Sequence, residues 1–172
     1  MTALEQVIIL NHIFFIEYGF KGDSSHFHAP DNSIITDVID SRKGNPLSLS
    51  VLYSIIAQRL KIPIYGVNLP KHFVLAYVDE DNVLGILTGE TQKEQNVLFY
   101  INAFSKGVVF DKNDIDEFLV HLNLPQKDKY YAPCSNSDMI KRMLVNLRYS
   151  YAKRDKRARV EELDQMIEAM NR

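Results

Sequence analysis

The chain has 172 residues, of which 46% are hydrophobic and 24% are charged, and this globular composition excludes disorder or low complexity for the chain as a whole. A chain of this length buries roughly 70% of its unfolded surface, so we expect one domain over residues 1–172. The net charge is −2, and a single cysteine, Cys134, excludes an intramolecular disulfide. Folding therefore needs no oxidising compartment.

The first twenty residues are apolar but do not resemble a targeting segment. An acidic residue, Glu5, precedes most of the apolar stretch, and neither a basic segment nor a small-residue cleavage site accompanies it. No apolar run in the chain approaches the ~20 residues needed to span a bilayer. We therefore expect a soluble, cytoplasmic protein with no membrane partner.

Helices are predicted along the first part of the chain. Apolar residues recur at helical spacing from Leu4 to Tyr18, and glycines follow as stop signals. The segment SSHFHAPDNS is typical of a loop. A short helix is predicted around residues 34–39. A third begins sharply, with Asn45 as a good N-cap and Pro46 at the favoured first position, and its apolar run to Leu60 indicates a buried helix.

Strands follow this helix. Three segments are rich in β-branched and aromatic residues, namely IPIYGVNL, HFVLAYV and NVLFYIN, and they are expected to form an antiparallel sheet. Residues 83–87 are a candidate for an additional strand. The order of helices, sheet and further helices favours an α+β fold over a parallel βαβ fold.

The remaining helices are predicted from their caps and their apolar faces. Asp111 or Asn113 can cap a helix through Leu122, and Ser135 or Ser137 can cap another over residues 138–153. A last amphipathic helix is predicted over residues 160–170. Together these form a helical C-terminal appendage over about 111–172, attached to a core over about 30–110.

The start of the buried helix, His72 and Asn102 form the most informative set of residues. A cysteine on the first turn of a helix has its thiolate favoured by the helix dipole, and a histidine on a neighbouring strand accepts the proton. A third group, Asp or Asn, orients that histidine. A helix start, a histidine at the head of a strand and an amide on the next strand occur here in this order.

This order resembles that of the transglutaminase-like superfamily, with its bacterial SirB-type branch as the nearest match. The resemblance lies in KGNPLSLS, GVNLPKHF and LFYINAFSKG, supported by GFKG near the start and MIKRMLVNLRYSY near the end, and so spans most of the chain. It implies a papain-like core, with a central buried helix against a small antiparallel sheet and helices added at both ends. His72 matches the family's histidine, and Asn102 stands where an aspartate is usual.

The nucleophile is the decisive departure from this resemblance. The position expected to hold cysteine falls at or next to Pro46. Ser48 is the nearest hydroxyl, and we weigh it both as a weak nucleophile and, with more support, as a residue that binds free backbone N–H groups at the helix start. Cys134 precedes a helix whose N-terminus is expected to lower its pKa, but a small residue packed at a loop-to-helix junction is the commoner situation.

Two other features have functional and structural interpretations. His26 and His28, with Asp23 and Asp31 nearby, suggest a metal site, but no second ligand pair supports it, so a solvated loop is favoured and no metal is expected. No glycine-rich phosphate loop occurs, so no cofactor is expected. The basic stretch from Arg148 to Arg159 can attract nucleic acid, but basic helix ends are often only solvated and the rest of the chain is acidic.

Three hypotheses about function follow. The leading one is a transglutaminase-like domain that lacks the nucleophilic cysteine, is non-catalytic and binds another protein. The alternative is a residual cysteine or serine hydrolase, or an acyltransferase, using His72 and Asn102 with Ser48 or Cys134. The third is nucleic-acid binding through the basic stretch, which we consider unlikely.

Overall fold

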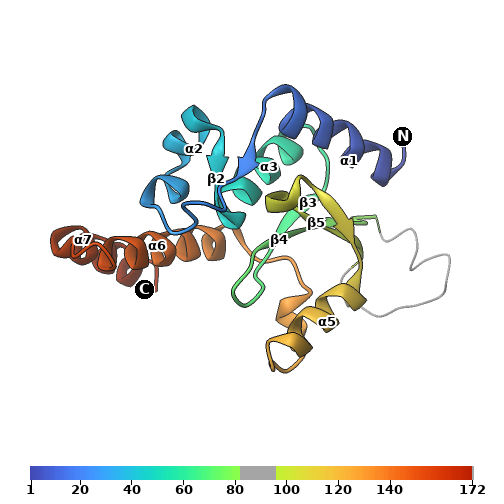
Figure 1. Cartoon of the computed structure of the whole chain (residues 1–172). Coiled ribbons are helices and arrows are strands. Elements are labelled where there is room, and N and C mark those ends of the chain that lie inside the picture. The colour runs from blue at the N-terminus through green and yellow to red at the C-terminus, as the bar shows by residue number, and fades with distance from the viewer. Residues whose placement is uncertain (82–95, 172) are drawn as a thin grey trace.

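A four-stranded antiparallel sheet lies at the centre of the structure, a computed structural model that describes residues 1–81 and 96–171 (Figure 1). The strands follow chain order across the sheet: β3 (Ile64–Val67), β4 (Val74–Val78), β5 (Val97–Asn102) and β6 (Val108–Phe110). The first three confirm the predicted strands. The short β6 was not predicted, and the candidate strand over residues 83–87 lies outside the described residues.

The helices before the sheet also agree with prediction. They are α1 (Ala3–Asn11), continued by η1 (His12–Glu17), α2 (Ile35–Ser41) and α3 (Pro46–Arg59). The π-helical geometry of η1 was not predicted, nor was the 3-10 turn η2 (Pro30–Ser33), which lies within the predicted loop. In η1 the N–H of Tyr18 donates to the carbonyl of Ile13, and this wider turn moves Phe14 and Phe15 into the core while Ile8 stays 58% exposed. Two-residue strands β1 (Lys21–Gly22) and β2 (Lys43–Gly44) form a small parallel pair.

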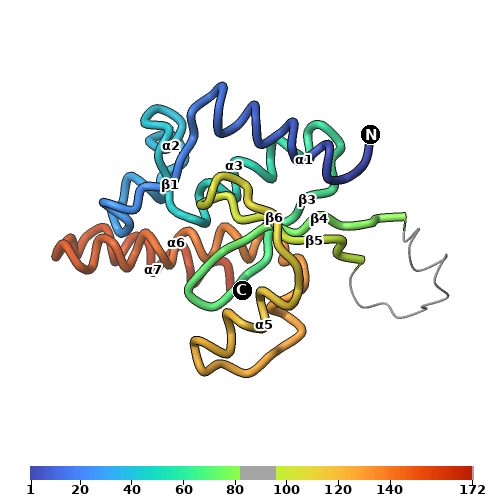
Figure 2. The backbone as a smooth tube through the Cα atoms, turned by 45° about the vertical axis from the view of Figure 1, so that its right-hand side comes forward, coloured from blue at the N-terminus to red at the C-terminus, as the bar shows by residue number. Residues whose placement is uncertain are grey.

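Three helices follow the sheet, at the predicted places. They are α5 (Lys112–His121), α6 (Asn136–Ala152) and α7 (Arg157–Ala169), with the 3-10 turns η3 (Ala103–Ser105) and η4 (Asp128–Tyr130) between other elements. Asp111 caps α5 and Ser135 caps α6, each within a capping box. Figure 2 shows α6 and α7 side by side, as a helical pair beside the core.

Alternate residues of the sheet pack on opposite sides, as the pleat of a strand requires. Leu75 and Tyr77 of β4 belong to a cluster with α3 and the N-terminal helix, whereas Val74 and Ala76 belong to a second cluster with α5 and Tyr131. Buried residues from the N-terminal helix and from α5 therefore contribute to packing around the sheet. The predicted boundary between core and appendage stays a prediction.

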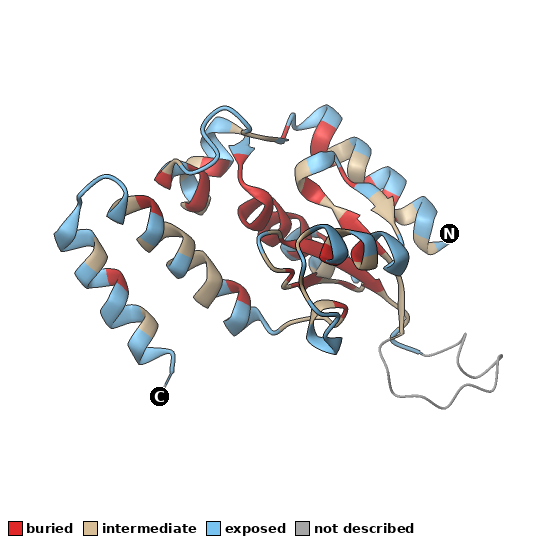
Figure 3. Cartoon of the chain, turned by 60° about the horizontal axis from the view of Figure 1, so that its bottom comes forward, coloured by how far each residue is buried: buried red, intermediate tan, exposed pale blue. Residues whose placement is uncertain are grey.

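Helix α3 is the most buried of the helices within residues 1–81 and 96–171 (Figure 3). All nine residues from Pro46 to Ser54 are buried, in contrast to the mostly exposed α7 (Figure 3). This confirms the prediction of a buried central helix and places its N-terminus beside the sheet. Within residues 1–81 and 96–171, no helix has the length and apolarity required to cross a membrane.

Candidate functional site

The start of α3 is fixed by a reciprocal capping box. The N–H of Ser48 donates to Asn45 Oδ1 at 2.9 Å, and the N–H of Asn45 donates to Ser48 Oγ at 3.0 Å. The amide of Asn45 also donates to Ser33 Oγ at 2.9 Å, which joins α3 to η2. Pro46 occupies the first helical position, where its missing N–H is not needed.

The hydroxyls near this helix start are engaged in local hydrogen bonds. Ser48 is 1% exposed, and Gly44 leaves room for its hydroxyl, since a Cβ there would lie 2.7 Å from Ser48 Oγ. Ser50 is fully buried and donates to the carbonyl of Pro46 at 2.7 Å. Ser48 therefore has the capping role that the sequence favoured, and neither serine lines the cavity that contains His72.

His72 lies on the loop between β3 and β4, and Arg142 of α6 holds this loop in place. The guanidinium donates to Asn68 Oδ1, to the Leu69 carbonyl at 2.6 Å and to the His72 carbonyl at 2.9 Å. It also lies 5.5 Å from the centre of the Phe73 ring. One side chain of α6 thus positions the backbone of the candidate site.

A side-chain hydrogen bond joins His72 to Asn102, at the end of β5. Burial lowers the pKa of His72, the hydrogen bond to Asn102 raises it, and the charge of Arg142 lowers it, with a net pKa below the ordinary value. Asn102 Oδ1 also accepts from the backbone N–H groups of Phe104 and Ser105, which fixes the orientation of the amide. The imidazole is thereby held neutral near pH 7 and oriented.

A cavity of about 550 Å³ lies between the start of α3, the β3–β4 loop and α6. His72 and Pro46 both line it, as do Leu47, Arg142 and Tyr149. We call it the His72 cavity. Its volume is within the range of pockets that bind small molecules or parts of a peptide. No cysteine is among its lining residues.

Cys134 lines a different cavity of about 560 Å³, which also borders Arg142, Lys71 and Asp138. We call it the Cys134 cavity. Burial and the nearby Asp138 charge raise the pKa of the Cys134 thiol to about 11. The expectation of a lowered pKa was therefore wrong, because burial and the nearby carboxylate outweigh the backbone hydrogen bond and the Arg142 charge, which lower it.

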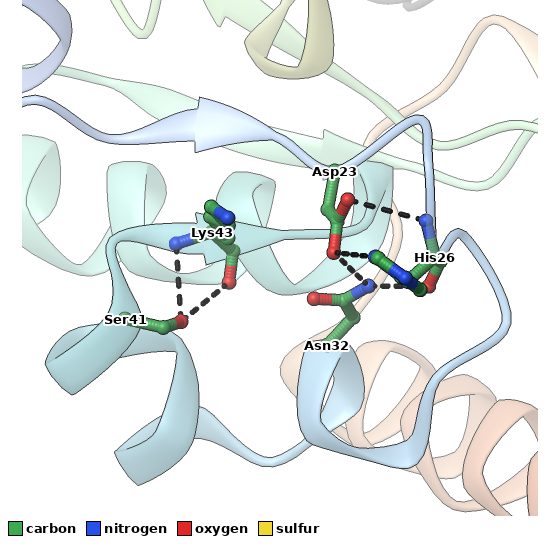
Figure 4. A network of polar contacts seen from close by, with 5 residues as sticks. All are labelled: Asp23, His26, Asn32, Ser41 and Lys43. Atoms are coloured by element: carbon green, nitrogen blue, oxygen red, sulfur yellow. Dashed lines mark hydrogen bonds and ion pairs between the residues drawn. The ribbon is translucent and has the colours of Figure 1, made fainter.

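His26 and His28 do not converge on a common point with other ligands. His26 Nδ1 lies 3.7 Å from Asp23 Oδ2, and Asn32 donates to the same carboxylate and to the His26 carbonyl (Figure 4). The His28 ring instead packs 5.8 Å from that of Tyr149. In the part of the chain that the structure describes, no three His, Cys, Asp or Glu side chains gather as a metal site would require.

The basic stretch forms ion pairs within the C-terminal helices. Arg148 pairs with Asp164, Arg157 with Asp155 and Arg159 with Glu162. Half of its six basic residues therefore have a carboxylate neighbour. These pairs reduce the net positive field that would attract a polyanion.

Sequence reasoning missed Arg142. It is distant from His72 along the chain and lies within an ordinary amphipathic helix, so its spacing carries no signal. The hydrogen bonds it makes across about 70 positions depend on how α6 packs against the β3–β4 loop. Only tertiary structure brings these two segments together.

Comparison with known proteins extends this description. The family model described as Transglutaminase-like superfamily matches residues 1–145. A UPF0162 protein of Xylella fastidiosa is 36% identical over 75 residues, covering 44% of this chain and 27% of that protein. A UPF0162 protein of Pseudomonas aeruginosa is 37% identical over 73 residues, covering 42% and 27%.

Human F-box only protein 21 is also similar, at 32% identity over 100 residues, covering 57% of this chain and 14% of that protein. The matched parts amount to about a quarter of the length of the UPF0162 relatives. No solved structure is a significant match.

Proposed function

The chain belongs to the transglutaminase-like superfamily, and on that premise we propose that it is a non-catalytic member that binds another protein through the His72 cavity. Its relatives among the UPF0162 proteins are SirB-like, as the sequence resemblance indicated. The assignment of the fold to this superfamily and to the α+β class is likewise confirmed. The absence of catalysis and the protein partner are our proposals.

The observation that carries the proposal is the composition of the His72 cavity. His72 and Pro46 line the same cavity, and proline has no nucleophilic side chain. An oriented, neutral imidazole can accept a proton only from a group within hydrogen-bond reach. The hydroxyl of Ser48 is instead used in the capping box, and Cys134 lines the other cavity.

Turnover assays test this proposal. We expect no thiol-protease, deamidase or acyl-transfer turnover with broad peptide and ester substrates. His72→Ala should consequently leave the background rate unchanged. Turnover above background in the wild type that disappears in a correctly folded His72→Ala protein would overturn the proposal.

The retained pair of His72 and Asn102 favours a second candidate, a residual hydrolase or acyltransferase that uses Ser48 or Cys134. An amide partner is compatible with catalysis, since papain-like proteases use Cys-His-Asn. Fluorophosphonate and iodoacetamide probes separate the two candidates. Labelling of Ser48 or Cys134 faster in the native than in the denatured protein supports the second, and background labelling supports the first.

A partner protein is favoured over nucleic acid by the ion pairs of the basic stretch. Charge reversal of Arg154 and Lys156, whose side chains lie outside those pairs, tests the polyanion hypothesis. We expect no gel shift with single- or double-stranded nucleic acid at moderate salt. A shift that disappears on this charge reversal would support nucleic-acid binding instead.

A further inference from the structure

The His72 cavity has a positively charged wall without an acidic counterpart. Lys71 and Arg142 both line it, and none of its lining residues, all in the described part of the chain, is Asp or Glu. This is notable in a chain whose net charge is −2. A cavity lined by one sign of charge raises the local concentration of ligands of the opposite sign.

The charge of Arg142 is offset only by neutral groups. Its three hydrogen bonds go to two carbonyls and to the amide of Asn68, and no ion pair joins it to a carboxylate among residues 1–81 and 96–171. A guanidinium carries five N–H donors, so two remain without an acceptor in those ranges. Burial lowers the pKa of Arg142, which reflects a charge partly removed from water.

Lys71 adds an accessible charge next to this guanidinium. It is exposed, adopts a positive φ of 59° on the β3–β4 loop, and immediately precedes His72. Its ammonium forms no salt bridge with the described carboxylates. Together, Lys71 and Arg142 provide one exposed cation and one cation held by hydrogen bonds at the same cavity.

Aromatic rings form the other part of the wall. The ring of Phe27 lies 5.1 Å from that of His28, which lies 5.8 Å from that of Tyr149. Phe27 and Tyr149 are 38% and 50% exposed. Accessible aromatic residues beside cations are typical of protein-binding surfaces, where aromatic residues and arginine contribute most of the affinity.

We infer that the His72 cavity binds an acidic peptide segment of a partner protein, in which an Asp or Glu side chain pairs with Arg142 and Lys71 and a neighbouring apolar side chain packs against Phe27 and Tyr149. The inference rests on the proposed function and specifies the chemistry of its ligand. The peptide carboxylate supplies the negative charge that the lining lacks. Its oxygens accept hydrogen bonds from the two remaining guanidinium N–H groups of Arg142. No reaction is required.

Selection of a random peptide library displayed on phage against the wild-type protein tests this inference. We expect enriched peptides with an internal Asp or Glu beside a large apolar residue. The most enriched sequence is then synthesised with blocked ends and a fluorophore, together with the same peptide carrying Gln or Asn in place of the acid. By fluorescence anisotropy, the neutral peptide should bind at least about tenfold more weakly.

Variants of the protein locate the binding site. Lys71→Gln should weaken binding of the acidic peptide about three- to tenfold, and Arg142→Gln at least about thirtyfold. Lys61→Gln is a matched control, since Lys61 is also exposed with φ of 59° but does not line the cavity. Because Arg142→Gln can also loosen the loop, the comparison of Lys71→Gln with Lys61→Gln decides the result.

Several outcomes would overturn the inference: enriched peptides without an internal acid, binding only through a free C-terminal carboxylate, equal affinity for the acidic and neutral peptides, or equal effects of Lys71→Gln and Lys61→Gln. None of these would restore catalysis, so the proposal of a non-catalytic domain would stand. Conversely, turnover that depends on His72 would overturn that proposal without affecting peptide binding.

Discussion

The two cavities that meet at Arg142 contain complementary parts of a thiol active site. The His72 cavity has an oriented imidazole and no thiol, and the Cys134 cavity has a thiol but lacks an imidazole among its lining residues. Both are lined by Lys71 and Arg142, so they are neighbours. The presence of cysteine, histidine and asparagine in one chain therefore does not by itself make an active site, because thiol chemistry requires them in one cavity.

Removal of Arg142 should have the largest effect on this arrangement. Arg142→Met deletes three hydrogen bonds to the β3–β4 loop and leaves the part-buried carbonyl of His72 without this donor, while the carbonyl of Leu69 keeps only the 3.4 Å bond from the N–H of His72, at a cost on the order of 3 kcal/mol. Urea unfolding measures the loss. As a control, Arg148→Met removes only an exposed ion pair, which contributes little. Equal losses in the two variants would contradict the role given to Arg142.

The reactivity of Cys134 tests the other cavity. A thiol pKa of about 11, against an ordinary value of 9.0, lowers the thiolate fraction about 100-fold at roughly pH 8. Iodoacetamide should therefore label Cys134 about 100-fold more slowly in the native protein than in urea. Mass spectrometry measures the rates. Native labelling as fast as in urea would place a reactive thiol where we expect an inert one.

The cap of α3 determines the position of Pro46 beside His72, so loss of this cap should also change the geometry of the His72 cavity. Asn45→Ala removes the hydrogen bonds to Ser48 and Ser33 and should lower the free energy of unfolding by about 2 kcal/mol. Ser135→Ala, at the exposed cap of α6, should cost about 1 kcal/mol. A smaller loss for Asn45→Ala than for Ser135→Ala in urea unfolding would contradict this ranking.

The pH dependence of stability should report on His72. Its pKa is lower in the folded state than the ordinary 6.5, so on acidification the unfolded state binds the proton first. The stability contributed by the neutral imidazole is complete above pH 6.5 and is lost as the pH falls toward the folded pKa. The slope from this group is at most ~1.4 kcal/mol per pH unit.

His72→Gln should flatten the slope of unfolding free energy against pH below 6.5 relative to the wild-type protein. Urea unfolding at a series of pH values measures both slopes. An unchanged slope in His72→Gln would show that His72 titrates alike in the two states.

Local signals in the sequence predicted most of the fold. The Asn-Pro start of α3, the caps Asp111 and Ser135 and the β-branched strands are each encoded within a few neighbouring residues, and the structure contains them. The three-residue β6 was missed because its length gives no periodicity. The π-helical turn η1 was missed because it changes the helical register without any proline or glycine to mark it.

The site was predictable only in part. The order of helix start, His72 and Asn102 along the chain resembled that of a known family, and this gave two of the residues that line the His72 cavity, His72 and Pro46. The separation of Cys134 from His72 and the contacts of Arg142 depend on the packing of α6 against the β3–β4 loop. The raised pKa of Cys134 follows from burial and the Asp138 charge, which a helix N-terminus in the sequence does not reveal.

Reintroduction of sulfur beside His72 tests most directly whether the nucleophile is the only missing part. In a Cys134→Ser background, we predict that Pro46→Cys yields a thiol that iodoacetamide labels near pH 7 at least about tenfold faster than in urea. Adding His72→Ala should remove this acceleration, because imidazole and the helix N-terminus together favour the thiolate. If Pro46→Cys is labelled no faster than in urea, or equally fast without His72, the His72 cavity does not retain the geometry of a thiol site.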